Sequence, residues 1–512
     1  MRKAGVLLHI SSLPSRWGIG DFGPESIRFA SFLNKAGVSL WQILPITPIE
    51  QAMGNSPYSP ISAFAGNYLY ISPELLVDSG LLDKNDPDLI APPIFSNEKV
   101  DFSVVRSFKQ RLMLKAFERF TNRIDYFKND YEYFFNNNQY WLESWSFFAA
   151  LKKINNGKPW YEWDAGLKYR THEALHQAWL DYKNEIEYER FVQFIFFRQV
   201  NEFKKELNNL KIELVGDVPI YTTLDSADVW VKPWLFQLDN KLRPTHVAGV
   251  PPDYFSKTGQ FWGNPLYNWD IMKREDDNFS WWMSRLRHSL NLFNFLRIDH
   301  FRGLVDYWSI PYAEKTAENG FWASVPHNEF FAALRKEFPN RPFWAENLGI
   351  LTQDVNVIMK DMGFPGMLVL QFAWNNVSSN LHSPHNHTID NVVYTGTHDN
   401  DTTMGWFMEA TEEEKENLSV YIGSEVNEGN VCDGLIRLAL SSVANYAVIP
   451  MQDFLKLGTE ARFNKPSTPT GNWAWRMLPG MATETLAKDI LKKVKIYGRS
   501  SAKDDAKIKP QK

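Results

Sequence analysis

Three acidic residues stand where an apolar stretch of the chain gives way to polar residues. Asp299 follows Phe-Leu-Arg-Ile, Glu346 follows Pro-Phe-Trp-Ala, and Asp399 follows Tyr-Thr-Gly-Thr-His. If these stretches are parallel strands of a barrel, their carboxyl ends meet at one face, where catalytic residues gather. Paired carboxylates at such a face suit acid and nucleophilic chemistry at a sugar carbon. The alternative is that they are unrelated polar caps at strand ends.

The neighbours of two of these acids indicate different roles. Arg297 and Asp299 are two residues apart and share one face of a strand. A guanidinium beside a carboxylate keeps it ionised, as a nucleophile must be, although a purely structural ion pair looks the same in the sequence. Glu346 follows aromatic residues, and apolar surroundings raise the pKa of a carboxyl group. We therefore expect Glu346 to hold a proton near neutral pH.

The segment 248–267 is dense in glycine, proline and aromatic residues. Proline pairs and glycines fix turns from which the aromatic side chains project. Two interpretations fit this composition, an aromatic lid over a sugar chain and a rigid surface loop anchored by its own aromatics. Aromatic residues make up 15% of the whole chain, with 20 Trp, and a Trp face suits the C–H face of a pyranose ring.

The elements that must position these residues read as a repeated strand and helix pattern. Near-continuous apolar runs are typical of strands buried on both faces, and helical patterns separate many of them. The expected strands are Ala4–Ile10, Trp41–Ile46, Ile212–Ile220, Asn294–Asp299, Pro342–Glu346, Met367–Trp374, Asn391–Thr397 and Ala447–Gln452. This α/β pattern predicts a (β/α)8 TIM barrel.

Two long insertions interrupt the expected barrel. The first, at about 47–186, is mostly helical in pattern, and the second, at about 225–289, contains the aromatic loop. Insertions of this length are usually functional or form subdomains. We expect residues 1–498 to form a single catalytic domain, and the Lys-, Asp- and Ser-rich residues 499–512 to form a disordered tail.

Composition excludes several functions. The net charge is −5 without a basic stripe, so nucleic acid is not an expected partner. We find no apolar run of membrane-spanning length, no P-loop, no dinucleotide-binding glycine pattern and no zinc-type spacing of His and Cys, so we expect no membrane association, metal or cofactor. Cys432 is the only cysteine, which fits a reducing, cytoplasmic location. Met1–Ile10 weakly resembles a signal peptide but is interpreted as the first strand.

Several ordered motifs resemble those of one known family. They are Ser56-Pro-Tyr-Ser, Gly216-Asp-Val-Pro-Ile-Tyr221, Gly249-Val-Pro-Pro-Asp-Tyr-Phe-Ser256, Arg297-Ile-Asp-His-Phe-Arg-Gly303, Trp344-Ala-Glu-Asn-Leu-Gly349, Gly396-Thr-His-Asp-Asn-Asp401, Arg462-Phe-Asn-Lys-Pro466 and Gly471-Asn-Trp-Ala-Trp-Arg476. Together they resemble the 4-α-glucanotransferases, also called amylomaltases or disproportionating enzymes, glycoside hydrolase family 77. The resemblance implies a (β/α)8 barrel with inserted subdomains and without a separate C-terminal β-domain.

The resemblance also implies roles for single residues. Asp299 would be the nucleophile that forms a covalent glucosyl intermediate, Glu346 the general acid and base, and Asp399 the residue that holds the distorted sugar ring. The further substrate contacts that it implies are Arg297, His398, Asp217, Asp253, Trp262, Asn472, Tyr58 and Ser56.

The sequence therefore predicts a cytoplasmic 4-α-glucanotransferase that moves segments of α-1,4-glucans to glucose or maltooligosaccharides. It would need neither a metal nor an organic cofactor. Two rivals stay open at this point. One is an α-glucan hydrolase with the same carboxylates. The other is a barrel that binds glucan without catalysis, which predicts the loss of at least one of the three acids.

Overall fold

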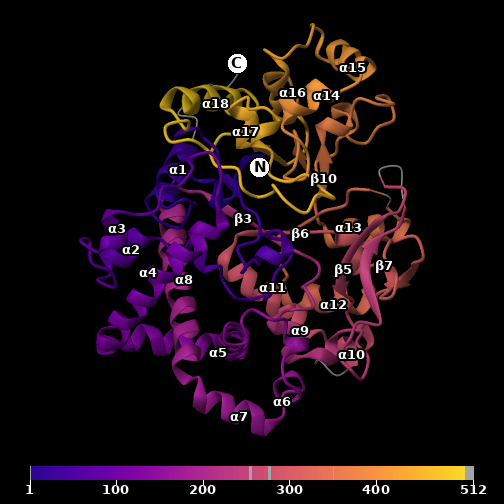
Figure 1. The fold of residues 1–512 in the computed structure, drawn as a ribbon. Coiled ribbons are helices and arrows are strands. Elements are labelled where there is room, and N and C mark those ends of the chain that lie inside the picture. The colour runs from indigo at the N-terminus through magenta and orange to yellow at the C-terminus, as the bar shows by residue number, and fades with distance from the viewer. Residues whose placement is uncertain (1, 253–255, 275–277, 350, 502–512) are drawn as a thin grey trace.

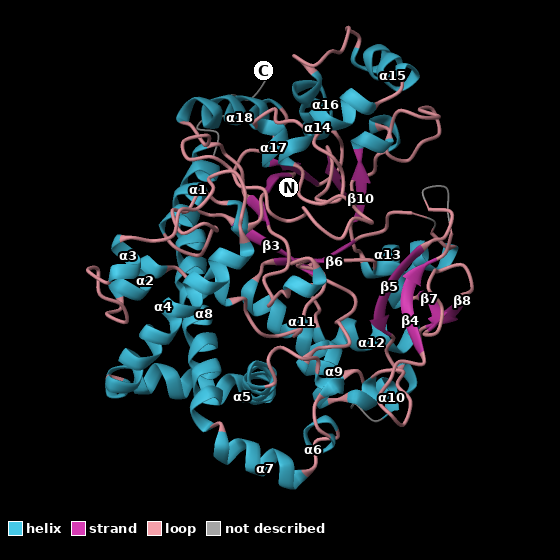
Figure 2. Cartoon of the chain, viewed as in Figure 1, coloured by secondary structure: helices cyan, strands magenta, loops and turns pink. Residues whose placement is uncertain are grey.

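Eight parallel strands form the central sheet of the molecule. The computed structural model describes residues 2–252, 256–274, 278–349 and 351–501. The central strands are β1 (Lys3–Leu7), β2 (Leu40–Gln42), β3 (Glu213–Val218), β6 (Phe295–Ile298), β9 (Phe343–Ala345), β10 (Gly366–Val369), β11 (Asn391–Tyr394) and β12 (Tyr446–Pro450). Figures 1 and 2 show the whole chain, with β3, β6 and β10 of this sheet labelled near its middle. All eight predicted strands are confirmed, although each ends earlier than expected at its carboxyl end.

The strand order makes this sheet a barrel. The order is β10-β11-β12-β1-β2-β3-β6-β9, and every neighbouring pair is parallel. The amide of Ala345 at the end of β9 donates to the carbonyl of Pro365, next to β10, at 2.9 Å and so joins the two edges. The predicted (β/α)8 fold is confirmed.

Apolar side chains from all eight strands fill the barrel interior, as expected for a packed barrel core. They include Leu7, Leu40, Val215, Phe295, Trp344, Met367, Val392, Tyr394 and Val448. A larger cluster lies between the barrel and the surrounding helices. Burial on both faces explains why these strands read as continuous apolar runs in the sequence.

Helices follow most of the strands and cover the barrel from outside. They are α1 (Pro24–Lys35), α8 (Lys183–Asn209), α11 (Ser280–Leu292), α12 (His327–Glu337), α13 (Gln353–Met362), α14 (Thr403–Glu409), α15 (Glu412–Ile422), α16 (Val431–Ser441), α17 (Met451–Phe454) and α18 (Glu484–Ile496). Only short 3-10 turns lie between β10 and β11 in this part of the chain. After β12 the described residues form helices and turns, with no separate β-domain.

The first insertion is a helical layer beside the barrel, at the lower left of Figure 1. Its helices are α2 (Pro73–Asp78), α3 (Pro87–Ile90), α4 (Phe102–Asn122), α5 (Ile124–Ile154), α6 (Ala165–Lys168) and α7 (His172–Asp181). Aromatic rings join it to α8, as in Phe120–Phe191 at 4.8 Å and Phe134–Phe197 at 5.7 Å between ring centroids. Helix α8 crosses the boundary expected near residue 186 and ties the insertion to the barrel.

The second insertion contains two strands, β4 (His246–Val250) and β5 (Gln260–Pro265), where the sequence predicts a loop. They join β7 (Asp306–Pro311) and β8 (Phe321–Ser324), which follow β6 in the chain, in an antiparallel sheet of order β5-β4-β7-β8, visible at the right of Figure 2. Glycine and proline near and within β4 and β5 hide their alternation in the sequence. Gly249 is needed there because a Cβ atom at this position would lie 2.3 Å from the carbonyl oxygen of Gln260. Helices α9 (Ala227–Val231) and α10 (Trp269–Arg274) complete this region.

The disordered tail predicted for residues 499–512 begins too early in the chain. Arg499 is buried, and its guanidinium donates to the carbonyls of Leu440 at 2.8 Å and Ala444 at 2.7 Å. The expectation of disorder is therefore wrong at Arg499, because a single Arg can cap several carbonyl groups. Residues 502–512 lie outside the described residues. Within the described ranges, no helix combines the length and the apolar character needed to cross a membrane.

Candidate active site

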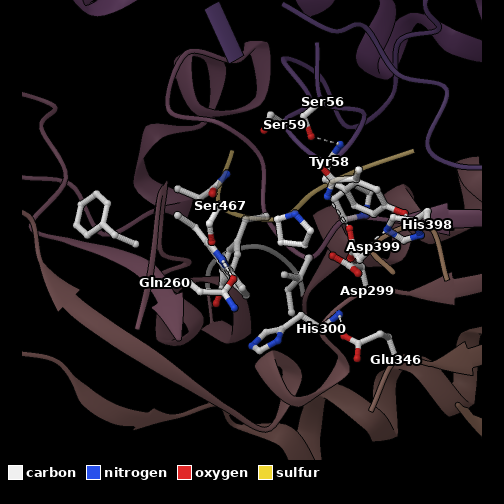
Figure 3. A pocket seen from close by; sticks show the side chains of 18 of the residues that line it. Ser56, Tyr58, Ser59, Gln260, Asp299, His300, Glu346, His398, Asp399 and Ser467 are labelled. Carbon is white, nitrogen blue, oxygen red and sulfur yellow. Dashed lines mark hydrogen bonds and ion pairs between the residues drawn. The ribbon is translucent and has the colours of Figure 1, made fainter. Parts of the chain in front are cut away.

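A cavity of about 620 Å³ opens at the carboxyl ends of the barrel strands (Figure 3). It brings together the three acids that the sequence singled out, from three different strand ends. Its lining includes Ser56, Tyr58, Ser59, Pro219, Ile220, Tyr221, Gly259, Gln260, Phe261, Trp262, Asn264, Asp299, His300, Glu346, His398, Asp399, Asn464, Pro466, Ser467 and Trp473. Asp299, His398 and Asp399 lie close to one another in the close-up, with Glu346 below them.

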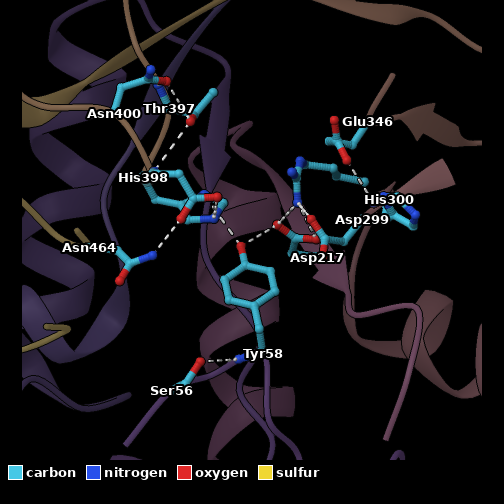
Figure 4. Close-up of polar contacts among 12 residues, drawn as sticks. Ser56, Tyr58, Asp217, Asp299, His300, Glu346, Thr397, His398, Asn400 and Asn464 are labelled. Carbon is cyan, nitrogen blue, oxygen red and sulfur yellow. Dashed lines mark hydrogen bonds and ion pairs between the residues drawn. The ribbon is translucent and has the colours of Figure 1, made fainter. Parts of the chain in front are cut away.

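Arg297 lies beneath the cavity and holds two carboxylates. Its Nη1 lies 2.9 Å from Asp299 Oδ1 and donates to both carboxylate oxygens of Asp217, at 2.9 and 2.7 Å (Figure 4). Asp217 and Asp299 outweigh the effect of burial and raise the pKa of Arg297 well above its ordinary value. The guanidinium therefore stays cationic and fixes the carboxylate of Asp299 at the cavity floor.

Glu346 follows β9 and accepts two backbone hydrogen bonds. The amide of His300 donates to its Oε2 at 2.8 Å, and the amide of Leu348 donates to its Oε1 at 2.7 Å. Burial nevertheless raises the pKa of Glu346 to about 7, aided by Asp299 and opposed by Arg297. The carboxyl group can thus exchange a proton near neutral pH, as the sequence predicted.

His300, whose amide donates to Glu346, has an unusual backbone conformation. His300 has a φ of 47°, in the left-handed region that residues with a side chain rarely adopt. Its ring meets Trp262 edge to face, with centroids 4.9 Å apart. Strain of this kind persists where the surroundings impose it, and it is concentrated at functional sites.

Asp399 is held from two sides at the cavity wall. Its Oδ2 lies 3.3 Å from Nε2 of His398, and its Oδ1 accepts a hydrogen bond from Asn464 Nδ2 at 2.7 Å. Arg462 donates to the backbone carbonyl of Asp399 at 2.8 Å. Desolvation within the cavity favours the neutral acid, but His398 and the hydrogen bond from Asn464 hold the pKa of Asp399 well below its usual range. Asp399 is therefore an ionised acceptor that faces the cavity.

Tyr58 joins the two halves of the site. Its hydroxyl donates to Asp217 Oδ2 at 2.8 Å and lies 3.4 Å from Nδ1 of His398. The two rings are stacked with centroids 4.8 Å apart. Ser56 accepts a hydrogen bond from the amide of Tyr58 at 3.2 Å, which fixes the turn that presents this ring.

The opposite wall comes from strand β5. Trp262 donates from its indole nitrogen to Gln260 Oε1 at 3.1 Å, and Phe261 is 38% exposed beside them. Gln260 and Ser467 lie across the cavity from the acids in Figure 3. An amide, an indole and an exposed phenyl ring suit a ligand with both hydroxyl groups and apolar faces.

Some of the predicted site residues line the cavity and others do not. Arg297 and Asp217 lie beneath the cavity rather than on its wall. Asn472 does not line it; its Oδ1 accepts from the amide of Lys465 at 2.9 Å and so closes a loop. Asp253 lies outside the described residues. The remaining predicted residues line the cavity.

Sequence reasoning missed several lining residues, among them Gln260, Asn264 and Asn464. Single amides carry no chemical signature in a sequence. The only available signal for Asn464 was its place within the motif Arg462-Phe-Asn-Lys-Pro466. Across the described residues, no group of three His, Cys, Asp or Glu side chains is arranged to hold a metal ion.

Comparison with known proteins identifies the family. The family described as 4-alpha-glucanotransferase, glycoside hydrolase family 77, matches residues 8–482. The 4-alpha-glucanotransferase of Aquifex aeolicus is 45% identical over 98% of this chain and 100% of its own length. That of Thermus thermophilus is 42% identical over 94% of this chain and 95% of its own.

A solved structure agrees with these sequence matches. The amylomaltase from Streptococcus agalactiae in complex with acarbose superposes with a TM-score of 0.93 at 35% identity, covering 98% of this chain and 100% of that chain. The chain therefore belongs to the 4-alpha-glucanotransferase family and is an enzyme of the glycosyltransferase type.

Proposed function

We propose that this enzyme transfers a segment of an α-1,4-glucan to the 4-hydroxyl of glucose or a maltooligosaccharide, with retention of configuration. The observation that carries the proposal is the pairing of Asp299 and Glu346 in one cavity. The guanidinium of Arg297 lies 2.9 Å from the carboxylate of Asp299, whereas burial raises the pKa of Glu346 to about 7. A carboxylate positioned as a nucleophile and a carboxyl group that exchanges a proton are what a retaining double displacement requires.

In the first step, Asp299 attacks the anomeric carbon of the donor and the glycosidic bond breaks. Glu346 gives its proton to the departing oxygen, so the shortened glucan leaves as a neutral alcohol. The sugar is now an ester of Asp299. The esterified side chain of Asp299 carries no charge at this stage, and Arg297 is left paired with Asp217 alone.

In the second step, the 4-hydroxyl of the acceptor attacks the same carbon from the other side of the ester bond. Glu346, now ionised, takes the hydroxyl proton, and Asp299 leaves as a carboxylate. Asp399 would bind ring hydroxyls and hold the distorted sugar through both steps. Its low pKa and its bonds to His398 and Asn464 support this role.

Transfer and hydrolysis share the same intermediate and differ in the acceptor. A sugar acceptor held on the β5 wall gains proximity that a loose water molecule lacks. The aromatic pair Trp262 and Phe261 supports this assignment, because both side chains line the cavity from β5 and offer an acceptor their apolar faces. The non-catalytic rival predicted the loss of an acid, but Asp299, Glu346 and Asp399 all line the cavity.

The test is incubation of the purified enzyme with maltotriose, with the products resolved over time beside those of Asp299→Asn. The proposal predicts glucose together with a ladder of longer maltodextrins, absent in the variant. Glucose and maltose without longer chains would instead establish the hydrolase. If maltotriose is inert, the same assay with maltoheptaose must give the redistribution; an inert wild type there would overturn the proposal.

A further inference from the structure

A second cavity of about 170 Å³ lies between the helical insertion and the barrel. Its walls come from α5, α9 and the first turn of α11, together with the segment that carries Ser62 and Phe64. The same segment lines the catalytic cavity at Ser59, three residues before Ser62. An extended chain of three residues spans at most about 11 Å, so the two cavities are close neighbours along this segment.

Five aromatic residues line this cavity: Phe64, Tyr140, Trp141, Trp145 and Trp281. Four of them are buried, but Tyr140 is 55% exposed. Its hydroxyl lies 3.2 Å from Nδ1 of His288, and His288 is itself fixed through Nε2, 2.8 Å from the carbonyl of Phe64. Tyr140 is thus an open ring held in place at its polar end.

A ring fixed in this way is a good surface for stacking. Little side-chain freedom remains for a ligand to remove, so less free energy is lost on binding. Phe64 meets Tyr140 edge to face, with centroids 5.9 Å apart, and holds its second edge. Other exposed aromatic residues of the insertion, such as Tyr133 at 74% exposure, do not line this cavity.

Serine side chains line the cavity among these rings. Ser144 lies one helical turn after Tyr140 on α5, and Ser280 and Ser284 lie one turn apart on α11, so each pair shares a helix face. Within the described part of the chain, the hydroxyls of Ser144 and Ser284 have no protein hydrogen-bond partner. The nearby carboxylate of Asp228 is engaged, since it accepts the amide of Ala63 at 2.8 Å.

A buried donor adds to this pattern. Trp145 lines the cavity and is 5% exposed, and its indole nitrogen has no acceptor among the described residues. A buried donor without an acceptor costs about 1–3 kcal/mol. An open aromatic face, two available hydroxyls and an unsatisfied N–H match a neutral ring with several hydroxyl groups better than an anion or an apolar ligand.

We propose that this cavity binds one glucosyl unit of a long α-1,4-glucan, with the sugar ring on Tyr140 and its hydroxyls on Ser144 and Ser284. The enzyme would thereby keep a polymeric substrate bound between successive transfers. This inference rests on the proposed function for the identity of the sugar. It also gives the helical insertion a role beyond packing against α8.

The test measures binding of amylose in native gels, in the Asp299→Asn background so that the polysaccharide is not consumed. Tyr140→Ala and Ser144→Leu should each weaken the apparent affinity for amylose at least threefold. Ser144→Leu fills the cavity without removing the contacts of Tyr140, so a folding defect specific to Tyr140→Ala cannot mimic the result. Tyr133→Ala, an exposed tyrosine on the same helix, should bind amylose like the background variant.

The same substitutions in the active enzyme should leave turnover of maltotriose unchanged, because that substrate reports on the catalytic cavity. Equal amylose affinity in all variants would overturn the second site. The wild-type maltotriose ladder is recorded beside them. A missing ladder counts against the proposed function, whereas unaltered amylose binding with an intact ladder counts against this cavity alone.

Discussion

Asp217 and Arg297 face each other in register on neighbouring barrel strands, and one guanidinium nitrogen reaches both carboxylate oxygens, at 2.7 and 2.9 Å. The pair is almost completely buried. The same nitrogen lies 2.9 Å from Asp299 Oδ1. The buried ion pair of Arg297 and Asp217 therefore also contacts the candidate nucleophile. The stability of the barrel and the orientation of Asp299 therefore depend on one residue.

Arg297→Met should reduce both stability and activity. Removing the cation leaves Asp217 buried and unpaired, which costs about 3–5 kcal/mol. Thermal denaturation measures the loss. The double variant Arg297→Met with Asp217→Asn removes the unpaired charge and should recover part of the stability without recovering activity, because Asp299 still lacks its cation. A double variant no more stable than Arg297→Met would show that the two residues are not coupled.

Glu346 should control the alkaline side of the activity profile. The pKa of about 7 means that its acid form, which the first step needs, is depleted above neutral pH. We expect kcat/KM to fall as the pH rises from about 7 to 9. Glu346→Gln should lower kcat by about 10²- to 10⁴-fold and abolish this alkaline decline. An alkaline decline that persists unchanged in Glu346→Gln would assign the titration to another group.

The raised pKa of Glu346 also predicts an effect on stability. The native state binds this proton more tightly than the unfolded chain, whose Glu pKa is about 4.3. The contribution is therefore present below about pH 4 and is lost as the pH rises toward 7. Glu346→Gln should raise the melting temperature at pH 8 and change it little at pH 4. An equal effect at both pH values would contradict the raised pKa.

Asn464 should act as a positioning residue for Asp399. It donates to Oδ1 at 2.7 Å, and removing this bond frees one side of the carboxylate and raises its pKa. Asn464→Ala should lower kcat about tenfold, with a further loss on acidification that begins at a higher pH than in the wild type, because Asp399 takes up a proton more readily. Asn464→Asp should be worse at neutral pH because it brings a like charge. Activity unchanged in both variants would remove Asn464 from the site.

Trp262 should favour sugar acceptors over water. It lies on the β5 wall and packs against the ring of His300, at 4.9 Å between centroids. Trp262→Ala should therefore raise the share of hydrolysis severalfold, measured as reducing ends released per transfer event. An unaltered ratio of transfer to hydrolysis would show that this wall does not select the acceptor.

Much of the barrel could be predicted because strands buried on both faces leave continuous apolar runs, as around Ile298 and Val393. The acids at the strand ends could be predicted for the same reason, since they interrupt such runs. The antiparallel sheet could not, because Gly249 and the neighbouring prolines break the alternation on which strand prediction depends.

The supporting contacts of the site were beyond reach for a different reason. Asn464 is 65 residues from Asp399, and a lone amide in a loop carries no sign of its partner. Arg297 was expected to support Asp299, but its stronger engagement with Asp217 depends on the register of β3 and β6. Contacts of this kind are set by tertiary structure, which residue types and spacing do not encode locally.

The most direct test of the account is to trap the sugar ester on Asp299. α-Maltosyl fluoride needs no acid for its first step, so Glu346→Gln should form the intermediate but lack the base that passes it to an acceptor. After acid quenching and peptide mass spectrometry, we expect the mass of one maltosyl unit on the peptide that contains Asp299, and none in Asp299→Asn. An adduct on another residue, or release of product without any adduct, would contradict a covalent mechanism through Asp299.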